Sequence, residues 1–431
     1  MRIKQRPEDF SVTESYRFCK HPTGRYRVYL MDKQKLSTFE AVEIVRERFG
    51  LKPGAISYCG LKDKQGRTEQ IIAVESADVQ MQEPNLRLKF LGRTEQPLSA
   101  QNTSSNRFSV TTRGLSPQEM ELLHQNATEI KELGCINYFD SQRFGSIKHG
   151  QGYIAKDLIR GDFETALRNY MAKPSKLDKT DDAKVKQFWA DNWGKFDAYC
   201  PYAANKKYAR ILFSLRKAPR DFARAFMQIN SDYRAMLLFT YQSFLWNEGV
   251  RRLLQCMFSR EDLALIPYQA GSLLFHKRAT PEQINTLKQL HFPLLSPQST
   301  FSNPQVEEAV SWVLGKEKLK LEDLKVPQVK GKLFFKHEER PLLVFPYKLV
   351  VGKVREDELN PPQKKINVAF TLKPGSYATL LIKRLFLQDT PSAEARAADT
   401  KAPRKAFNRR APRRPHRGGA QRQPRRERNS T

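Results

Sequence analysis

Alternating apolar residues mark both ends of this chain, whereas its middle carries the three- and four-residue spacing of helices. Near the start, Tyr26, Val28 and Leu30 alternate with polar or basic neighbours. Apolar runs return after Pro341, in segments 342–345, 349–351 and 377–382. Alternation with a period of two is typical of strands that bury one face. We therefore expect an α+β fold, in which both ends of the chain build one sheet domain and a helical insertion interrupts it.

The first 115 residues contain the clearest individual elements. Ser37 and Glu40 have the spacing of a capping box, and Gly50 stands where a helix C-cap belongs, so residues 38–49 are predicted to form a helix. Short strands are predicted at 25–31, 55–59, 70–74 and 108–112. Further along, residues 233–255 are predicted to form the longest amphipathic helix.

The chain is strongly basic. It holds 75 Lys and Arg against 46 Asp and Glu, a formal net charge of +29. A charge of this size favours a polyanionic partner, with nucleic acid as the first candidate and an anionic membrane surface as the second. Residues 391–431 alone hold 13 Lys or Arg and 3 Asp or Glu, with almost no large apolar side chains. Because such a tail cannot bury enough surface to offset its ordering entropy, it is predicted to be disordered.

Apolar runs and cysteines indicate the compartment. No stretch approaches the ~18 consecutive apolar residues of a membrane span, so no membrane association through a span is expected. The start of the chain has no apolar segment of the kind found in a signal peptide. The cysteines lie far apart and form no CxxC pair: Cys19, Cys59, Cys135, Cys200 and Cys256. This spacing predicts reduced thiols in a cytoplasmic protein, without structural zinc.

Motifs for nucleotide and metal chemistry are missing from the sequence. Residues 145–150 have the glycine spacing of a phosphate-binding loop, but Gln151 stands where its lysine must be. The seven histidines show neither HExxH nor paired metal-ligand spacing. A nucleic-acid enzyme built from this chain is therefore expected to work without a nucleotide cofactor and without a metal.

The most suggestive site is the loop around Asp63, in the segment 60–67, GLKDKQGR. Lys62, Lys64 and Arg67 are predicted to surround its carboxylate, and nearby cations favour the ionised form that a nucleophile or base requires. The alternative is an ordinary turn, because Asp beside glycine commonly caps a turn while flanking lysines face water. On spacing alone the ordinary turn is the better interpretation.

Three further segments change that balance: KQRPEDF at 4–10, NYFDSQRFG at 137–145 and LKPGSYAT at 372–379. Together with the Asp63 loop, and in this order along the chain, they resemble the signatures of the TruD family of tRNA pseudouridine synthases. The resemblance covers roughly residues 1–155 and 340–386, whereas 160–335 is similar in composition only. The sequence departs from the family pattern at Asp140, where glycine is usual, and at Tyr377, where phenylalanine is usual.

The resemblance implies a fold and a domain organisation. Family members have a pseudouridine-synthase catalytic core, a mixed and mostly antiparallel sheet with flanking helices, which a helix-rich TruD-type domain interrupts. On this chain we expect the first segment of the catalytic domain at 1–160, the insertion domain at 161–339, the return segment at 340–390 and the basic tail at 391–431. The RNA would lie in the cleft between the two domains.

The resemblance also implies a role for each matched residue. Asp63 would start cleavage of the uridine glycosidic bond, with Lys4 beside it to hold the carboxylate ionised. Phe10, Asn137 and Tyr377 would contact the substrate nucleotide, since a ring can stack on a flipped base and an amide can read the uracil edge. Phe139 is equally well explained as a substrate contact and as core packing.

These expectations define a cofactor-free tRNA pseudouridine synthase that acts as a monomer, with uridine-13 of the D-arm as its target. The alternative is a non-catalytic RNA-binding or RNA-folding protein that uses the same cleft as a clamp, but a clamp needs neither Asp63 nor Lys4. An association with anionic membranes through the tail is less favoured, because the body offers no basic amphipathic helix.

Overall fold

The computed structural model describes residues 1–147, 152–175, 178–329 and 331–388. The basic tail at 391–431 and the loop position Gln151, on which two of the sequence predictions rest, lie outside the described residues.

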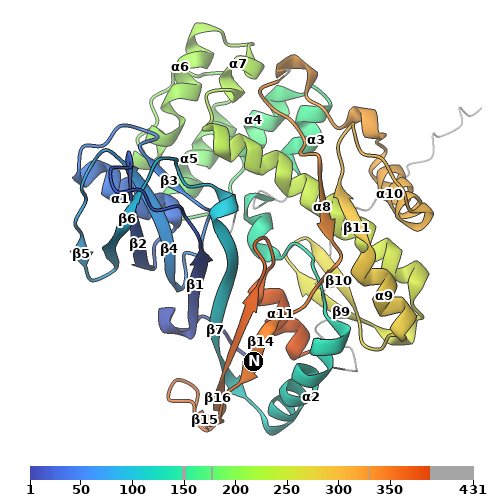
Figure 1. Ribbon diagram of the computed structural model, residues 1–431. Helices are drawn as coiled ribbons and strands as arrows, with labels where there is room; N and C mark the ends of the chain where they lie inside the picture. The colour runs from blue at the N-terminus through green and yellow to red at the C-terminus, as the bar shows by residue number, and fades with distance from the viewer. Residues whose placement is uncertain (148–151, 176–177, 330, 389–431) are drawn as a thin grey trace, which may run out of the picture.

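One large sheet dominates the described structure (Figure 1). Its ten strands run in the order β14-β16-β7-β1-β4-β2-β6-β5, with β15 added to β16 and β3 added to β4. They are β1 (Phe10–Tyr16), β2 (Tyr26–Gln34), β3 (Ile56–Tyr58), β4 (Arg67–Glu75), β5 (Gln82–Glu83), β6 (Leu86–Thr94), β7 (Thr103–Leu115), β14 (Tyr347–Val351), β15 (Arg355–Glu356) and β16 (Lys364–Leu372). Within the sheet only β1 and β4 pair in parallel, and the other neighbours are antiparallel.

The two ends of the chain meet in this sheet, as expected, but of the predicted C-terminal runs only 349–351 enters it, within β14, and β16 was not predicted. Strand β16 pairs along its length with β7, which brings Phe370 opposite Phe108. The two rings stack with their centroids 5.5 Å apart. Burial of such aromatic pairs holds the return segment against the first hundred residues.

Helices cover the sheet at several places. Helix α1 (Thr38–Arg48) begins at the predicted capping box, where the Ser37 hydroxyl accepts a hydrogen bond from the Glu40 amide at 3.1 Å. Its Ala41 and Val45 pack on β2 and β4. Helices α2 (Pro117–Leu133) and α11 (Ala378–Leu385) pack against each other near β14.

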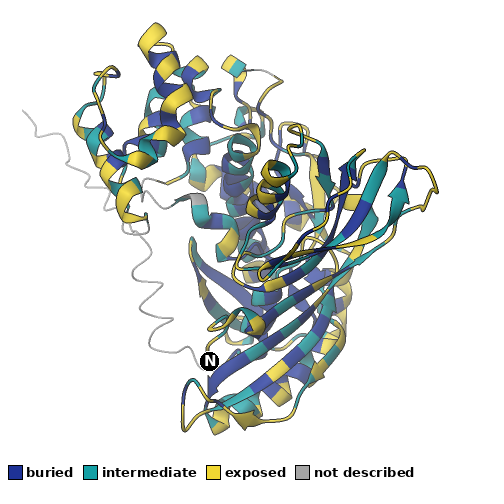
Figure 2. Ribbon diagram, turned by 90° about the vertical axis from the view of Figure 1, so that its left-hand side faces the viewer, coloured by how far each residue is buried: buried dark blue, intermediate teal, exposed yellow. Residues whose placement is uncertain are grey.

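The middle of the chain is mostly helical and gathers beside the sheet (Figure 1). Its helices are α3 (Ile154–Ile159), α4 (Phe163–Met171), α5 (Thr180–Asp191), α6 (Ala209–Lys217), α7 (Phe222–Phe226), α8 (Ser231–Met257), α9 (Pro281–Gln289) and α10 (Pro304–Glu317). The dark blue interior in Figure 2 follows the strands of the sheet and the inner turns of these helices. Helix α8, predicted from the sequence at 233–255, is buried along much of its length.

Short strands accompany these helices, and of them only β13, within the predicted run 342–345, had a signal in the sequence, although it pairs outside the large sheet. β9 (Leu263–Tyr268) and β10 (Gly271–His276) form a hairpin, β11 (His291–Leu294) pairs with β12 (Glu338–Pro341), and β8 (Cys135–Ile136) pairs with β13 (Leu343–Val344). None of the helices in the described part of the chain is both long and apolar enough to cross a membrane.

One sheet prediction is wrong. The apolar run at 377–382 belongs to helix α11, and the strand lies before it, at Lys364–Leu372. Leu380, Leu381 and Ile382 are all buried, so the run shows no alternation between an inner and an outer face. A short continuous apolar run does not distinguish a buried helix from a buried strand, and here the helix forms.

Candidate active site

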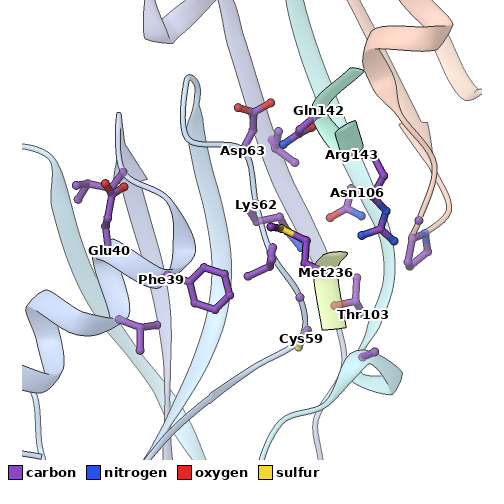
Figure 3. Close-up of a pocket in the computed structure, with 18 of the residues that line it drawn as sticks. Phe39, Glu40, Cys59, Lys62, Asp63, Thr103, Asn106, Gln142, Arg143 and Met236 are labelled. Carbon is purple, nitrogen blue, oxygen red and sulfur yellow. The ribbon is translucent and has the colours of Figure 1, made fainter. Parts of the chain in front are cut away.

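Asp63 lies on the loop between β3 and β4, at a cleft of about 1380 Å³. One wall of the cleft comes from α1, the Asp63 loop and strands β1 and β7. The opposite wall comes from Gln142 and Arg143, the start of α8 and the loop 374–379. Figure 3 shows Asp63 and Lys62 with Gln142, Arg143 and Met236 around this hollow. The cleft thus joins segments from the beginning, middle and end of the chain.

The Asp63 carboxylate is held by one cation and one amide. The Lys4 ammonium forms an ion pair with Oδ2, and the Gln65 backbone amide donates to Oδ1 at 2.9 Å. Each side chain of the pair is only 13% exposed. Both oxygens therefore have a fixed direction, and the carboxylate lines the cleft as a held group rather than as a mobile surface side chain.

Lys4 is placed by anchors on both sides of it. Arg2 and Arg113 exchange two backbone hydrogen bonds of 2.8 Å, and Arg113 forms an ion pair with Asp9 at 2.8 Å. Between these anchors Lys4 adopts a left-handed backbone with φ of 59°. Such a conformation costs a non-glycine residue ~1 kcal/mol, so the surrounding contacts must impose it. From this position the Lys4 ammonium pairs with Asp63.

The lysines and arginine that flank Asp63 in sequence do not pair with it. Each forms an ion pair with another carboxylate: Lys62 with Glu14, Lys64 with Glu40, and Arg67 with Asp32. The predicted ring of Lys62, Lys64 and Arg67 around the carboxylate is therefore corrected, because the cation that pairs with Asp63 is the distant Lys4.

Buried polar groups fix the backbone of the loop. The Thr38 hydroxyl accepts from the Lys62 amide at 2.9 Å and donates to Gln70, whose amide donates to the Gly60 carbonyl at 3.1 Å. The Lys62–Glu14 pair lies almost wholly inside the protein, and Glu14 also accepts from the Ile71 amide. Unpaired buried groups of this kind are costly, so each contact resists movement of the loop.

Lys33 adds a buried ammonium beneath the loop. It donates to the carbonyl oxygen of Asp63 at 3.0 Å and to that of Leu36 at 2.7 Å. Burial lowers the pKa of Lys33 to about 8, although the charge of Asp63 opposes this shift. The sequence analysis assigned no role at this site to Lys33, Glu14, Thr38 or Gln70, because nothing in their local sequence shows that they meet the loop.

Phe10 forms the floor beside the ion pair. Its ring lies 4.1 Å from the Lys4 ammonium and contacts Phe108 edge-on. Gly66 packs against the same residue so closely that a Cβ there would lie 2.2 Å from the Phe10 carbonyl oxygen. Only glycine fits at position 66, and this contact sets the distance between the loop and β1.

The remaining predicted substrate residues divide between two cavities. Tyr377 lines the cleft with Asp63 and Phe10, and burial raises the pKa of its hydroxyl. Asn137 and Phe139 instead line an adjoining cavity of about 790 Å³, which shares Arg143 and Tyr377 with the cleft. The structure thus brings Asp63, Lys4, Phe10 and Tyr377 together. Asn137 and Phe139 lie in the adjoining cavity, outside the lining of the cleft.

Arg340 links Asn137 and Phe139 to the cleft. Its guanidinium donates to the Asn137 side-chain oxygen and backbone carbonyl at 2.7 Å each, and to the Gly375 carbonyl at 2.9 Å. It lies 4.3 Å from the centroid of the Phe139 ring, which also packs against Tyr377. Burial lowers the pKa of Arg340 to about 10, so it remains charged at neutral pH.

Asp140, one of the departures from the family pattern, connects the segment that carries Asn137 and Phe139 to helix α11. It is buried and accepts hydrogen bonds from Thr379 and from Lys383, the latter at 2.7 Å. Burial would raise the pKa of Asp140, but Lys383 and Thr379 outweigh it and leave the pKa lowered. The Asp140 contacts therefore fix the helix that follows Tyr377.

Two exposed apolar side chains in the cleft were not expected. Phe39 is 46% exposed and Leu61 is 60% exposed, and both line the cleft with Asp63. In the sequence, Phe39 fits the apolar stripe of helix α1, but the face that packs on the sheet is that of Ala41 and Val45.

Asn106 also lines the cleft, and its buried side-chain oxygen has no hydrogen-bond partner among the described residues. Within the described ranges, no group of three or more His, Cys, Asp or Glu is arranged to hold a metal ion.

A solved structure shares this architecture. The crystal structure of the putative tRNA pseudouridine synthase D from Methanosarcina mazei matches the chain with a TM-score of 0.64 and 23% identity, over 89% of this chain and 93% of that one. The chain therefore shares the fold of that protein, which confirms the α+β architecture predicted from the sequence.

The family follows from sequence comparison. The family model of tRNA pseudouridine synthase D (TruD) matches residues 1–385, and the chain belongs to this family of isomerases. Among the relatives, the probable tRNA pseudouridine synthase D 2 of Methanocaldococcus jannaschii is 33% identical over 394 residues, which cover 90% of this chain and 92% of that protein. The tRNA pseudouridine synthase D of Aquifex aeolicus is 31% identical over 404 residues, covering 91% and 100%. The resemblance inferred from the motifs is thereby confirmed.

Proposed function

We propose that this protein converts uridine-13 in the D-arm of tRNA to pseudouridine, with Asp63 as the group that starts the reaction. The observation that carries this proposal is the Lys4–Asp63 ion pair in a cleft lined by aromatic rings, in a chain of the TruD family. A structural turn residue would not need a strained lysine from a distant segment as its partner.

The reaction is an isomerisation that balances without any co-reactant. The bond between C1′ of the ribose and N1 of the base breaks, the uracil turns, and a bond forms between C1′ and C5. The proton leaves C5 and N1 gains one. An ionised Asp63 would assist departure of the base, and Lys4 would keep the carboxylate charged. No cofactor, metal or partner subunit enters this scheme, and we propose a monomer that meets tRNA in the cytoplasm.

The proposed substrate contacts follow from the walls of the cleft. Phe10 and Tyr377 would flank the flipped uracil, because both rings lie in the cleft with Asp63. Phe139 supports Tyr377 from behind through ring packing. For Asn137, contact with the base requires that its amide exchange Arg340 or the Pro341 carbonyl for the substrate, since it bonds both here.

Incubation with unmodified tRNA transcripts tests the proposal. Carbodiimide treatment followed by primer extension should give a new stop at uridine-13. A control transcript with cytidine at position 13 should give no new stop. Tight binding of tRNA without any such stop would contradict the enzymatic proposal and favour the RNA-clamp alternative. A stop at another uridine would contradict the assignment of the site alone.

A further inference from the structure

The adjoining cavity of about 790 Å³ carries an excess of positive charge. Its lining includes five basic side chains, Arg143, Lys288, Lys336, Arg340 and Lys373, and two acidic ones, Glu338 and Glu339. Lys336 forms an ion pair with Glu338 at 3.6 Å, whereas Lys288 and Lys373 are exposed and neither has an ion pair among the described residues. A concave surface with unpaired ammonium groups attracts a polyanion.

The cleft around Asp63 has the opposite character. Its lining includes the acidic side chains Glu40, Glu43, Glu47, Asp63 and Asp232, against the basic side chains Lys62 and Arg143. Lys62 is neutralised by Glu14. On the wall formed by α1, Glu40 pairs with Lys64, while Glu43 and Glu47 lie against Arg46. This wall offers no free cation to a phosphate, whereas its exposed Phe39 suits a base.

Arg340 lines the adjoining cavity next to the segment that both cavities share. Two of its three nitrogens are fixed by Asn137 and Gly375, and Gly375 lines both cavities. The third, Nη1, has no hydrogen-bond partner in the described part of the chain. A guanidinium that is already oriented and charged binds a phosphate with little loss of side-chain freedom.

Aromatic rings in the adjoining cavity are paired with its lysines. The Lys288 ammonium lies 5.2 Å from the centre of the Phe345 ring, and that of Lys336 lies 5.0 Å from the centre of the Phe239 ring. Both rings line the cavity. Alternation of rings and cations is the arrangement that holds single-stranded nucleic acid, because bases stack while the backbone meets charge.

We infer that the adjoining cavity binds the sugar–phosphate backbone next to the flipped uridine, so that the RNA strand leaves the Asp63 cleft past Arg340 toward Lys288, Lys336 and Lys373. This inference rests on the proposed function for the position of the uridine. It assigns the side on which the strand leaves the cleft, because the α1 wall lacks free positive charge whereas Lys288 and Lys373 supply it in the adjoining cavity.

A triple variant, Lys288→Ala with Lys336→Ala and Lys373→Ala, tests the inference in the full chain. The matched control is Lys52→Ala with Lys131→Ala and Lys217→Ala, which removes the same charge from exposed residues outside both cavities. Binding of a tRNA transcript is measured against salt. Each phosphate contact contributes a slope of about 0.7 in log affinity against log salt, so the triple variant should lose up to about 2.

The control should keep the slope of the wild type to within about 0.7, the value of one contact. Equal slopes for wild type and the cavity variant would overturn the inference, as would an equal loss in the control. Because binding is measured without turnover, a wild-type protein that binds in this way but makes no pseudouridine would contradict the proposed function alone.

Neutral linkages locate the strand. In a synthetic D-arm stem-loop, methylphosphonates replace single phosphates on either side of the target uridine. The wild type should lose several-fold in affinity at one or two positions on one side, and the cavity variant should show no further loss there. If a methylphosphonate weakens binding by the same factor in the cavity variant as in the wild type, that phosphate is bound outside the adjoining cavity. This result would overturn the inference.

Discussion

The ammonium of Lys4 pairs with the carboxylate of Asp63 from a left-handed backbone position, across 59 residues of sequence. A short N-terminal segment and a loop between two strands thus supply the two charges of the candidate active site. The backbone hydrogen bonds between Arg2 and Arg113 and the close packing of Gly66 on Phe10 fix the positions of these two segments relative to each other.

Replacing the carboxylate tests the chemistry. Asp63→Asn should reduce pseudouridine formation by at least about 1000-fold while tRNA affinity stays within a few-fold, because a group needed only in the transition state contributes little to ground-state binding. Single-turnover assays and filter binding measure the two quantities. The control Asp32→Asn, which removes the partner of Arg67, should remain active. Turnover retained by Asp63→Asn would refute its proposed role.

Changes at Lys4 separate its charge from its backbone conformation. Lys4→Met should slow single turnover by ~10–100-fold, less than the loss of Asp63, because the cation supports the carboxylate without forming a bond. Lys4→Gly relieves the left-handed strain and should be equally slow, since it also lacks the ammonium. If the glycine variant reacts as fast as the wild type, the ion pair has no part in the reaction.

The two glycines of the Asp63 loop should respond differently to alanine. Gly66→Ala places a Cβ 2.2 Å from the Phe10 carbonyl oxygen, so the loop must move. A displacement near 1 Å at a reacting group costs up to about 100-fold in rate, and overpacking lowers the free energy of unfolding by ~1–3 kcal/mol. Gly60→Ala is the control, because its Cβ would meet nothing within 4 Å. Similar kinetics for both variants would contradict the role assigned to the Gly66 contact.

Asp357 gives the fold a measurable acid sensitivity. Burial would raise its pKa, but hydrogen bonds from Asn360 and the Gly114 and Leu359 amides, with Arg113, outweigh burial and lower the pKa to about 2. Because the folded-state pKa lies below the ordinary 3.8, the group stabilises the fold above pH 4, and this contribution is lost as the pH falls toward 2.

Urea midpoints at pH 7, 4 and 2.5 measure this effect. Asp357→Asn should lower the midpoint at pH 7 and flatten its decline between pH 4 and 2.5. The exposed control Asp197→Asn should follow the wild type at all three pH values. A decline as steep in Asp357→Asn as in the wild type would assign the acid sensitivity to other carboxylates.

The basic tail is expected to add affinity without selectivity. Its Arg- and Pro-rich composition suits phosphates and offers nothing that reads a base edge. Truncation after Thr390 should leave the modified position unchanged, weaken binding to all RNAs alike, and reduce the salt slope by about 0.7–0.9 for each lost contact. An identical slope would mean that the tail touches no phosphate, and a different modified uridine would mean that it helps to select the site.

The sequence alone determined the architecture and the family. Period-two alternation at both ends predicted a sheet built from distant segments, and the return of β14 and β16 to the N-terminal strands confirms it, although β16 itself lay outside the predicted runs. The Ser37–Glu40 capping box predicted the start of α1, because capping depends on groups within one helical turn. Four short motifs in a fixed order identified the TruD family, which the match over residues 1–385 confirms. The domain boundaries at 160/161 and 339/340 remain predictions.

Only the tertiary structure decided which charges meet. Lys62, Lys64 and Arg67 lie beside Asp63 in sequence, yet each pairs with a carboxylate from another element, and the partner of Asp63 comes from the N-terminal segment. Phe39 has the helical spacing of an apolar stripe with Val42 and Val45, but the register of α1 on the sheet turns it into the cleft. Helix caps and strand alternation arise from neighbours in the chain, so they are visible in sequence. Ion pairs and cleft walls arise from segments that strand register brings together, so they exist only once the chain has folded.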